Sequence, residues 1–267
     1  MTVPAPTEIE ACLVALGPDP DALYESIKAL DLVLDVRVGD FLSLELRDEY
    51  YDDEEGSLLG QQCALRLREV TDEQGQRTLL TFKGPAESHG DSCAERIELE
   101  QSWSVEFMGE VLEHMRSRDL PFPSECPQGD AQSVLAALGL RSIQVRENHR
   151  QLAVLGLPSQ PIAELCLDRV TYKVADHQID HYEIELEARG ATSAQELLTL
   201  AADFEERYPR QLRAWPWAKT STGRNLERME TRGELLQHLE GNRLSADGYT
   251  RLGVYLKLGA FLAQSPG

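Results

Sequence analysis

The sequence predicts an α+β protein in which a closed antiparallel β-sheet carries helices on its outside and a helical segment at its C-terminal end. Three observations lead to this prediction. Apolar and charged residues alternate with a period of two in many short segments, which is typical of antiparallel strands with one polar face. Segments with apolar residues at helical spacing lie among them and after them. Basic residues, a minority in this chain, recur on the polar faces of the strand-like segments.

The first hundred residues are predicted to hold strands and one short helix. Residues 7–14 alternate and place Glu8, Glu10 and Cys12 on one face. After the break at 17–20, residues 21–30 show helical spacing, and residues 41–51 alternate again before an acidic turn at 52–56. Residues 64–68 and 78–83 flank a turn at 71–76, which predicts a β-hairpin. A polar loop at 86–92 then leads to a strand at 96–100.

The remaining chain repeats this rhythm of charged strands followed by a helix. Residues 104–118 are predicted to be helical, and the segment 120–129, with three prolines, is the clearest internal break. Residues 143–155, 161–174 and 182–187 are predicted strands. Residues 192–208 form a predicted helix in which Ser193 and Glu196 have the spacing of a capping box. Residues 225–264 are expected to form two or three helices, so we divide the chain into a domain of residues 1–224 and a helical extension of residues 225–267 packed on it.

Acidic residues outnumber basic ones by 46 to 26, so the formal net charge is −20. A protein that reads duplex nucleic acid usually has a basic surface, and anionic membranes attract basic segments, so the charge disfavours both partners. No apolar run reaches about 18 residues, and no basic region begins the chain, so neither a membrane span nor a presequence is expected. The five cysteines form no CxxC pair, which favours reduced thiols and a cytoplasmic protein.

Like charges share several of the predicted strand faces. Glu183, Glu185 and Glu187 lie on one face and repel one another unless cross-strand arginines or a bound divalent cation compensate them. Carboxylate oxygens suit Mg²⁺, Mn²⁺ or Ca²⁺, whereas Arg and Lys suit phosphate oxygens. A closed barrel of ~8 strands has room inside for one small ligand. The pattern therefore predicts an interior that binds a metal–polyphosphate complex. The basic strand-face residues are Arg66, Arg68, Lys83, Arg96, Arg146 and Arg150.

Several short motifs follow one another in order along residues 7–224. They are Glu8–Glu10, Tyr50–Asp52, Ala64–Arg68, Thr81–Gly84, Arg96–Glu100, Leu167–Asp168, Glu183–Glu187 and Ala218–Lys219. In this order the chain resembles the CYTH superfamily, the triphosphate tunnel metalloenzymes. The resemblance implies a tunnel of eight antiparallel strands with helices packed outside. It also implies that the tunnel binds a triphosphate group together with Mg²⁺ or Mn²⁺.

The resemblance assigns roles to individual residues. Glu98 is expected to place the attacking water, and Lys83 is expected to act beside it in catalysis. The implied metal ligands are Glu8, Glu10, Glu183 and Glu185, with Asp168 as a further acidic group that faces the tunnel. The implied phosphate-binding residues are Arg66, Arg68, Lys83, Arg146 and Lys219. The strand-face pattern adds Arg96 and Arg150 to the substrate-binding set.

The chain departs from the family pattern at two positions. Where the first strand of the family usually has a lysine, in the pattern ExExK, this chain has Cys12, which we interpret as a small tolerated residue. Near the C-terminus, Thr222 stands at the arginine position of the pattern SKxxRG, and Arg224 is the nearest replacement. Loss of the lysine removes one cation from the phosphate site. The absence of this lysine is expected to affect the rate and the choice of substrate more than the fold.

The predicted activity is that of a triphosphatase, which transfers the terminal phosphoryl group of inorganic triphosphate or a small organic triphosphate to water with the help of a metal. The chain has neither a P-loop nor a nucleophile–base motif. Three alternatives stay open: a module that binds polyphosphate or nucleotide with little catalysis, cyclisation of ATP to cyclic AMP, and an acidic β-rich protein whose charged faces are only solvated. The six histidines show no metal-binding spacing and are predicted at the surface. The C-terminal helices are expected to cap the barrel or to form a homodimer contact.

Overall fold

The strand order of the computed structural model, which describes residues 6–264 and the backbone alone for 260–264, is that of a closed eight-stranded antiparallel β-barrel. The order is β1 (Thr7–Ala15), β8 (Cys93–Ser102), β6 (Gly75–Lys83), β5 (Ala64–Asp72), β4 (Leu42–Asp52), β9 (Arg141–Leu157), β10 (Gln160–Val174) and β11 (His177–Ala188). β11 pairs with β1 in antiparallel register and completes the circle. The predicted fold class is therefore confirmed.

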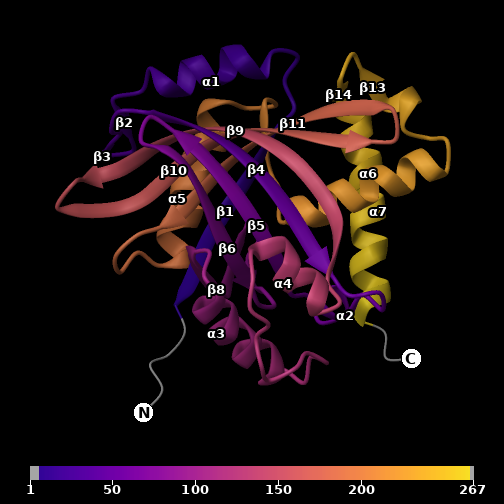
Figure 1. The fold of residues 1–267 in the computed structure, drawn as a ribbon. Coiled ribbons are helices and arrows are strands. Elements are labelled where there is room, and N and C mark those ends of the chain that lie inside the picture. Colours follow the sequence, from indigo (N-terminus) through magenta and orange to yellow (C-terminus); the bar gives the residue numbers. More distant parts are fainter. Residues whose placement is uncertain (1–5, 265–267) are drawn as a thin grey trace. The chain divides into compact units, whose positions relative to one another are not determined.

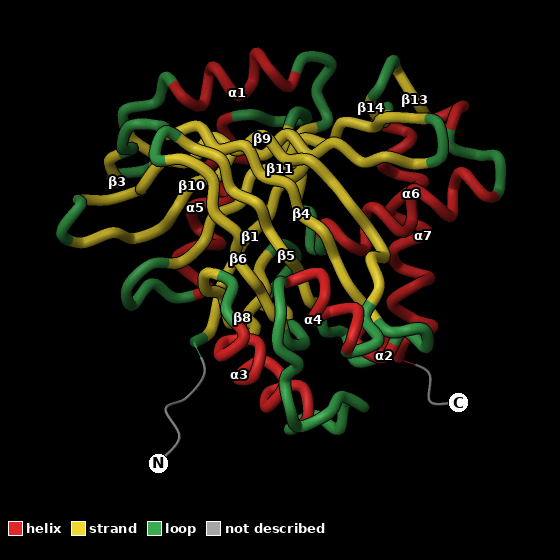
Figure 2. The backbone as a smooth tube through the Cα atoms, viewed as in Figure 1, coloured by secondary structure: helices red, strands yellow, loops and turns green. Residues whose placement is uncertain are grey.

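The chain consists of two compact units. Unit 1 contains the described residues up to Glu8 together with Glu45–Glu87 and Arg96–Arg146. Unit 2 contains Ile9–Leu44, Ser88–Glu95 and the residues from Glu147 onward. The strands β1, β4, β8 and β9 contribute residues to both units. Figure 1 shows the order of the elements along the chain, and Figure 2 distinguishes the strands from the helices and loops.

Unit 1 is built on the hairpin β5–β6, whose alternation places apolar and charged residues on opposite faces. The helices of this unit are α2 (Ser57–Gly60), α3 (Val105–Arg116) and α4 (Ala131–Ala137). Leu65, Leu80 and Phe82 form a buried core with residues of α3 and α4 such as Met108 and Val134. Burial of this face leaves the alternate residues, which include Arg66 and Arg68, on the other face of the same strands.

Unit 2 has an apolar core on one face of its strands. Leu13, Leu165 and Ile184 on β1, β10 and β11 pack there with helices α1 (Pro20–Lys28) and α5 (Ala194–Arg207), represented by Ile27 and Phe204. The predicted capping box begins α5: the Ser193 side chain accepts from the Glu196 backbone, and the Glu196 side chain accepts from the Ser193 backbone. Unit 2 also contains the short strands β2 (Leu32–Val33), β3 (Val36–Arg37) and β12 (Leu212–Ala214), and β7 (Glu87–His89) is shared between the units.

The C-terminal helices cover a second apolar cluster of unit 2. Helices α6 (Lys219–Thr231) and α7 (Ala246–Gln264) bring Leu226, Met229 and Leu252 against Val170 and Ile179. Between the helices lie a 3₁₀ helix (Leu236–His238) and the strands β13 (Leu239–Glu240) and β14 (Arg243–Leu244). Since Val170 and Ile179 share a face with the glutamates of these strands, that face changes along its length from charged to apolar.

Several predicted boundaries differ from the structure. The region 86–92 contains β7, which pairs with β8, and is not only a loop. The short helices α2 and α4 had not been predicted, because one or two turns carry too little periodic signal. Helix α6 begins at Lys219, so the expected boundary between residues 224 and 225 falls inside it.

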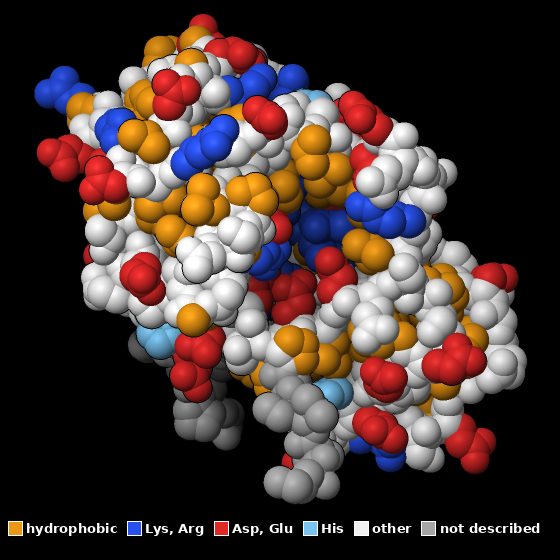
Figure 3. All heavy atoms as spheres, turned by 90° about the vertical axis from the view of Figure 1, so that its left-hand side faces the viewer, with side chains coloured by type: hydrophobic (Ala, Val, Ile, Leu, Met, Phe, Trp, Pro, Cys, Tyr) orange, Lys and Arg blue, Asp and Glu red, His pale blue; other side chains and the backbone are white. Residues whose placement is uncertain are grey.

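The surface reflects the composition of the chain. Acidic side chains are spread widely over the visible face in Figure 3, while Lys and Arg side chains are fewer, as expected for a net charge of −20. Within the residues that the structure describes, no helix is both long and apolar enough to cross a membrane.

Candidate active site: a basic cluster and an acidic cluster

Unit 1 gathers basic side chains from β5, β6, β8 and the first part of β9. We call Arg66, Arg68, Lys83, Arg96 and Arg146 the basic cluster. The antiparallel register places Tyr50, Arg66 and Thr81 side by side on adjacent strands, so their side chains form one row. Arg66 donates to Thr81 Oγ1 at 3.0 Å and to Glu100 Oε2 at 2.9 Å. The side chains of this row are therefore held by hydrogen bonds between strands.

Asp48 lies at the centre of the arginines and is fully buried, at 0% exposure. Arg68 binds it through two hydrogen bonds of 2.6 and 2.9 Å, and Arg66 and Arg146 each approach it to 3.5 Å. Burial alone would raise the pKa of the Asp48 carboxyl, but the charges of Arg68 and Arg66 hold it well below its usual range. Asp48 therefore stays ionised and holds three guanidinium groups together.

Tyr50 belongs to the same network. Its hydroxyl is hydrogen-bonded to Arg146, whose guanidinium carbon lies 4.4 Å from the centre of the Tyr50 ring. Burial raises the pKa of the Tyr50 hydroxyl, yet the charges of Arg146 and Arg66 outweigh burial and lower it. Neither Asp48 nor Tyr50 was among the predicted site residues. The signal that could have found them is their alternation in residues 48–52, on a strand next to Arg66 and Arg68.

Glu8 and Glu98 hold the other basic residues of unit 1. Lys83 Nζ lies 2.8 Å from Glu8 Oε2 and 3.2 Å from Glu98 Oε2, and Arg96 Nε lies 3.0 Å from Glu8 Oε2. Burial and the neighbouring Glu8 raise the pKa of Glu98 to about 8, against the charge of Lys83. Although burial also acts on Glu8, the charges of Lys83 and Arg96 lower its pKa well below the usual range. Near neutral pH, Glu8 is therefore ionised and Glu98 carries a proton.

The basic cluster has a surplus of positive charge. Its five cations face three ionised carboxylates, those of Glu8, Asp48 and Glu100, while Glu98 is protonated below a pKa of about 8. In these contacts, cations outnumber ionised carboxylates by five to three. Buried cations with an excess of positive charge suit a multiply charged anion such as a phosphate chain.

Unit 2 gathers carboxylates on the polar face of β1, β10 and β11. We call Glu10, Asp168, Glu183, Glu185 and Glu187 the acidic cluster. The register pairs Asp168 with Glu183 and Glu10 with Glu187, so neighbouring strands place like charges side by side. Such pairs destabilise a sheet unless cations lie between them. This cluster therefore requires compensation from within the protein or from a bound ion.

Arg150 and Lys219 supply part of this compensation. Arg150 binds both oxygens of Asp168 at 2.7 Å and also contacts Glu185 and, at 3.5 Å, Glu187. Lys219, the first residue of α6, contacts Glu185, Asp168 at 3.1 Å and Glu183 at 3.6 Å. Burial lowers the pKa of Lys219, but the charges of Glu183, Glu185 and Asp168 outweigh it and raise that pKa well above its usual value.

The two cations do not neutralise the acidic cluster. Arg189 also contacts Glu187, at 3.3 Å. Because Arg189 forms an ion pair with Glu164 as well, its positive charge is balanced by that carboxylate. In the contacts given above, five carboxylates face two cations, Arg150 and Lys219. Asp168 is held ionised, because Arg150 and Lys219 lower its pKa against the effect of burial. A surplus of carboxylate charge suits hard divalent cations.

His181 lies next to the acidic cluster, two residues before Glu183 on β11. Its predicted surface position is wrong. The side chain is only 1% exposed; Nε2 lies 3.0 Å from Glu183 Oε2, and Nδ1 lies 3.0 Å from the Tyr249 hydroxyl. The rings of Tyr172, Trp215 and Tyr249 surround it at 5.6–6.1 Å. His181 thus fixes the orientation of the Glu183 side chain. The signal in the sequence was its position two residues before Glu183.

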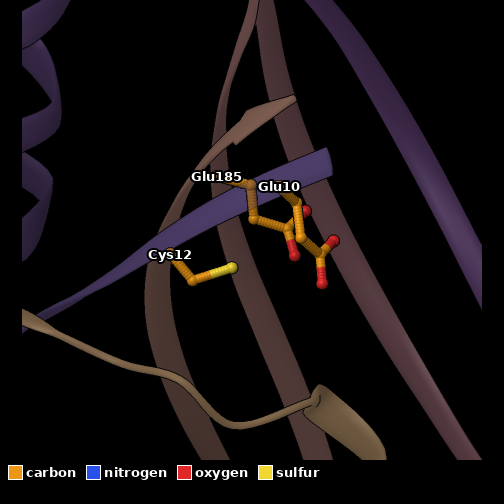
Figure 4. Close-up of side chains that lie close together, drawn as sticks. All are labelled: Glu10, Cys12 and Glu185. Carbon is orange, nitrogen blue, oxygen red and sulfur yellow. The ribbon is translucent and has the colours of Figure 1, made fainter. Parts of the chain in front are cut away.

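Cys12 stands beside Glu10 and Glu185. Its Cα pairs with that of Glu185 across β1 and β11, and the thiol is buried. Burial and the charges of Glu10 and Glu185 raise the pKa of the Cys12 thiol well above its usual value. Figure 4 shows the sulfur of Cys12 on the side of the strands where the two carboxylates lie. The ligand atoms of Glu10, Cys12 and Glu185 all lie within 4.8 Å of one another, so these donors can converge on one cation.

Thr222, at the other position that departs from the family pattern, has a structural contact. It is completely buried, and its hydroxyl accepts a hydrogen bond from Trp215 Nε1 at 3.3 Å. Trp215 in turn donates its backbone N–H to the Cys12 carbonyl at 2.9 Å. The start of α6, which carries Lys219, is therefore joined to β1 through Trp215.

A family model of the CYTH domain matches residues 22–211 of the chain. The chain belongs to the CYTH domain family. This assignment fits the strand order of a closed eight-stranded barrel and the predicted order of charged motifs. No curated protein sequence matches the chain.

Solved structures with the same fold include HpAC1 from Hippeastrum, named as an adenylyl cyclase and described as having a dominant triphosphatase activity. It is 17% identical, with a TM-score of 0.54 over 81% of this chain and 95% of that one. The PH1819 protein of Pyrococcus horikoshii is 16% identical, with a TM-score of 0.47 over 77% and 94% of the two chains. A Bacillus halodurans protein named as an adenylate cyclase is 20% identical, with a TM-score of 0.45 over 80% and 95%. At 17% identity, the likeness to HpAC1 concerns the fold alone.

The predicted site residues divide between the two units. Unit 1 holds Glu8, Arg66, Arg68, Lys83, Arg96, Glu98 and Arg146. Unit 2 holds Glu10, Arg150, Asp168, Glu183, Glu185 and Lys219. Within its unit, each set has the ion pairs given above. Of the predicted metal ligands, Glu8 binds Lys83 and Arg96, and Asp168 and Glu185 bind Arg150 and Lys219. Glu185 also lies with Glu10 and Cys12 in a group whose ligand atoms are within 4.8 Å of one another.

Proposed function

We propose that the chain is a divalent-metal-dependent triphosphatase that releases the terminal phosphate of inorganic triphosphate or of a small organic triphosphate. One observation carries the proposal: polar strand faces of a CYTH fold hold a basic cluster in which cations outnumber carboxylates, and an acidic cluster in which carboxylates outnumber cations. The first surplus matches phosphate oxygens, and the second matches the cation that accompanies a triphosphate.

The basic cluster is assigned to the phosphate chain. Arg66, Arg68 and Arg146 are held by Asp48 before any ligand binds, so little side-chain freedom is lost on binding. Guanidinium groups fixed in this way stabilise the charge that builds on phosphoryl oxygens in the transition state. Lys83 and Arg96 extend the same set on β6 and β8.

The acidic cluster is assigned to Mg²⁺ or Mn²⁺. Glu10, Glu183 and Glu185 would hold the ion, and His181 would keep Glu183 in place. When bound, the ion supplies Lewis-acid polarisation of the phosphoryl oxygens. Lys219 and Arg150 contact the same carboxylates, and a carboxylate has enough lone pairs to accept both an N–H donor and a cation.

Glu98 is assigned to the attacking water. It lies beside Lys83, and its pKa of about 8 is close to the pH at which a general base works best. In its ionised form, the Glu98 carboxylate can accept the proton of a water molecule that attacks the terminal phosphorus. Lys83, 3.2 Å from Glu98, is then placed to donate to a phosphoryl oxygen.

Hydrolysis is preferred here over cyclisation of ATP. HpAC1, which shares the fold, is described with a dominant triphosphatase activity although it is named as a cyclase. A second candidate, a module that binds polyphosphate with little turnover, is favoured by Cys12 at the position where the family has a lysine. The two candidates predict the same ligand but differ in phosphate release.

The test is phosphate release from tripolyphosphate, ATP and thiamine triphosphate with Mg²⁺ or Mn²⁺ and with EDTA. We expect metal-dependent release of one phosphate from at least one substrate. Glu10→Ala and Arg68→Ala are each expected to lower the rate at least about tenfold, since each removes a charge that contacts metal or phosphate.

Matched controls are available on the surface. Arg77, on β6, is 43% exposed at its side chain and pairs with Asp72, and Glu25, on α1, is 72% exposed and pairs with Lys28. Arg77→Ala and Glu25→Ala should therefore keep the wild-type rate. Absence of metal-dependent release from all three substrates contradicts the triphosphatase. Tight calorimetric binding of tripolyphosphate without release would establish the binding module instead.

A further inference from the structure

The group formed by Glu10, Cys12 and Glu185 contains a thiol among carboxylates. Glu10 and Cys12 lie two residues apart on one face of β1, and Cys12 pairs in register with Glu185 of β11. All three ligand atoms lie within 4.8 Å of one another. In Figure 4 the three side chains extend from the strands toward a common region. The geometry thus brings one sulfur and two oxygen donors together within unit 2.

The Cys12 thiol has no hydrogen-bond partner within residues 6–264, although it is only 7% exposed. Cys63, in contrast, donates from its sulfur to the Gln61 carbonyl at 3.5 Å. A buried polar group normally has a partner, and a cation between the sulfur and the two carboxylates would provide one. The surplus of negative charge in the acidic cluster favours a cation at the same place.

From this arrangement, we propose that Cys12, Glu10 and Glu185 form a thiolate–carboxylate site that binds a thiophilic divalent cation of the zinc class, such as Zn²⁺, Cd²⁺ or Co²⁺, in preference to Mg²⁺. The site rests on the proposed function, because it uses two carboxylates assigned there to the triphosphatase metal. Sulfur donors select such cations, whereas Mg²⁺ prefers an all-oxygen octahedron.

Binding exchanges a proton for the metal. The S–H bond of Cys12 breaks, its proton passes to solvent, and the sulfur keeps the electron pair that forms the bond to the cation; no redox change occurs. Thiolate–metal distances are about 2.3 Å and carboxylate–metal distances about 2.0–2.2 Å. Because the donor atoms already lie within 4.8 Å of one another, side-chain adjustment alone brings them to one ion.

The site is tested by titrating the metal-free full chain with Co²⁺ and recording the near-ultraviolet thiolate-to-cobalt charge-transfer absorption. We expect a band that saturates at one Co²⁺ per chain in the wild type and disappears in both Cys12→Ser and Cys12→Ala. The affinity for Cd²⁺, measured by calorimetry, should fall at least about tenfold in both variants, because the sulfur ligand is lost.

Cys166→Ser is the matched control. Cys166 is fully buried and pairs in register with Glu185 from the opposite side, on β10, but it is not part of the three-residue group. Its substitution should leave the cobalt band intact. Circular dichroism of each variant verifies folding, and the alanine and serine variants of Cys12 provide two independent tests.

The thiolate site and the triphosphatase can fail separately. Release of phosphate from tripolyphosphate, ATP and thiamine triphosphate with Mg²⁺ or Mn²⁺ is measured on the same preparations. Turnover without a cobalt band, or a band that survives both Cys12 variants, overturns the thiolate site and leaves the triphosphatase standing. A band that depends on Cys12 in a protein without turnover supports the thiolate site and overturns the triphosphatase.

Discussion

Asp48 illustrates at the residue scale how one buried side chain organises a binding surface. Its carboxylate accepts two hydrogen bonds from Arg68 and contacts Arg66 and Arg146. Without it, three guanidinium groups would be buried with reduced compensation. Asp48 does not touch the phosphate in our proposal, but it decides where the arginines that do so are held.

Asp48→Asn is expected to lower the free energy of unfolding by ~3–5 kcal/mol, because loss of one partner leaves buried charge uncompensated. Urea denaturation followed by circular dichroism measures this change. Asp72→Asn is the control: Asp72 lies at the turn of the hairpin and pairs with Arg77, whose side chain is 43% exposed, so the loss of stability should be much smaller. Equal effects of the two substitutions would contradict the role of Asp48.

The stabilising effect of Asp48 should depend on pH in one direction. Its pKa in the folded protein is lowered well below the ordinary value of 3.8. As the pH falls, the Asp48 carboxyl therefore takes up a proton in the unfolded chain before it does so in the folded protein. The contribution of Asp48 to stability is complete above pH 3.8 and is lost as the pH falls toward its pKa in the folded protein. The difference in melting temperature between wild type and Asp48→Asn should thus shrink below that pH. If the difference in melting temperature grows on acidification instead, the pKa of Asp48 is not lowered in the folded protein.

At the scale of elements, α1 is joined directly to the strands of the acidic cluster. The Tyr24 hydroxyl lies 2.8 Å from the Asp168 carbonyl and 2.9 Å from the Glu183 carbonyl. Asp168 and Glu183 are register partners on β10 and β11, so one helix residue holds the backbone of the pair whose side chains belong to the cluster. Leu23 and Ile27 of the same helix are buried in the adjoining core.

Tyr24→Phe is expected to cost about 1–2 kcal/mol of stability, because buried carbonyls lose a hydrogen-bond donor while the ring packing is kept. Thermal unfolding of the variant and the wild type measures the loss. Tyr208→Phe is a suitable comparison, since its hydroxyl contacts Ser26 at 3.2 Å in an exposed position. If Tyr24→Phe is no more destabilising than Tyr208→Phe, the contact of α1 with the two carbonyls is not a stabilising one.

At the scale of the whole molecule, the net charge of −20 conceals an uneven distribution. Basic residues are a minority, yet five of them gather with surplus positive charge in unit 1, while the acidic cluster of unit 2 keeps a surplus of negative charge. An overall negative charge repels long polyanions without preventing a small phosphate from binding a local group of cations.

A divalent cation is expected to stabilise the whole chain. Mn²⁺ at 100 times its dissociation constant should add about 2.7 kcal/mol, because it binds the folded state only. We expect a rise in melting temperature that EDTA reverses and that Glu10→Gln reduces. Glu25→Gln, on the exposed face of α1, should keep the full rise. An unchanged melting temperature of the wild type in millimolar Mn²⁺ would argue against a metal at the acidic cluster.

The local pattern of the chain was enough to predict most strands and the face on which each charged residue lies. Alternation with a period of two separates Arg66 and Arg68 from Leu65 and Leu67 wherever the strand is placed. The capping box at Ser193 and Glu196 was equally local, and the structure confirms it. The closed eight-stranded order followed from the ordered motifs, since no single strand pattern specifies its neighbours.

Only the tertiary structure decided which charges meet. Asp48 and Arg146 are 98 residues apart in the chain, and Glu185 and Lys219 are 34 apart, so no periodic pattern links them. Asp48, Tyr50 and His181 were missed for this reason, and His181 was wrongly predicted at the surface. The sequence by itself determined the faces, because alternation is a property of consecutive residues. The register between distant strands depends on the packing of both cores, and it alone brought Cys12 beside Glu185.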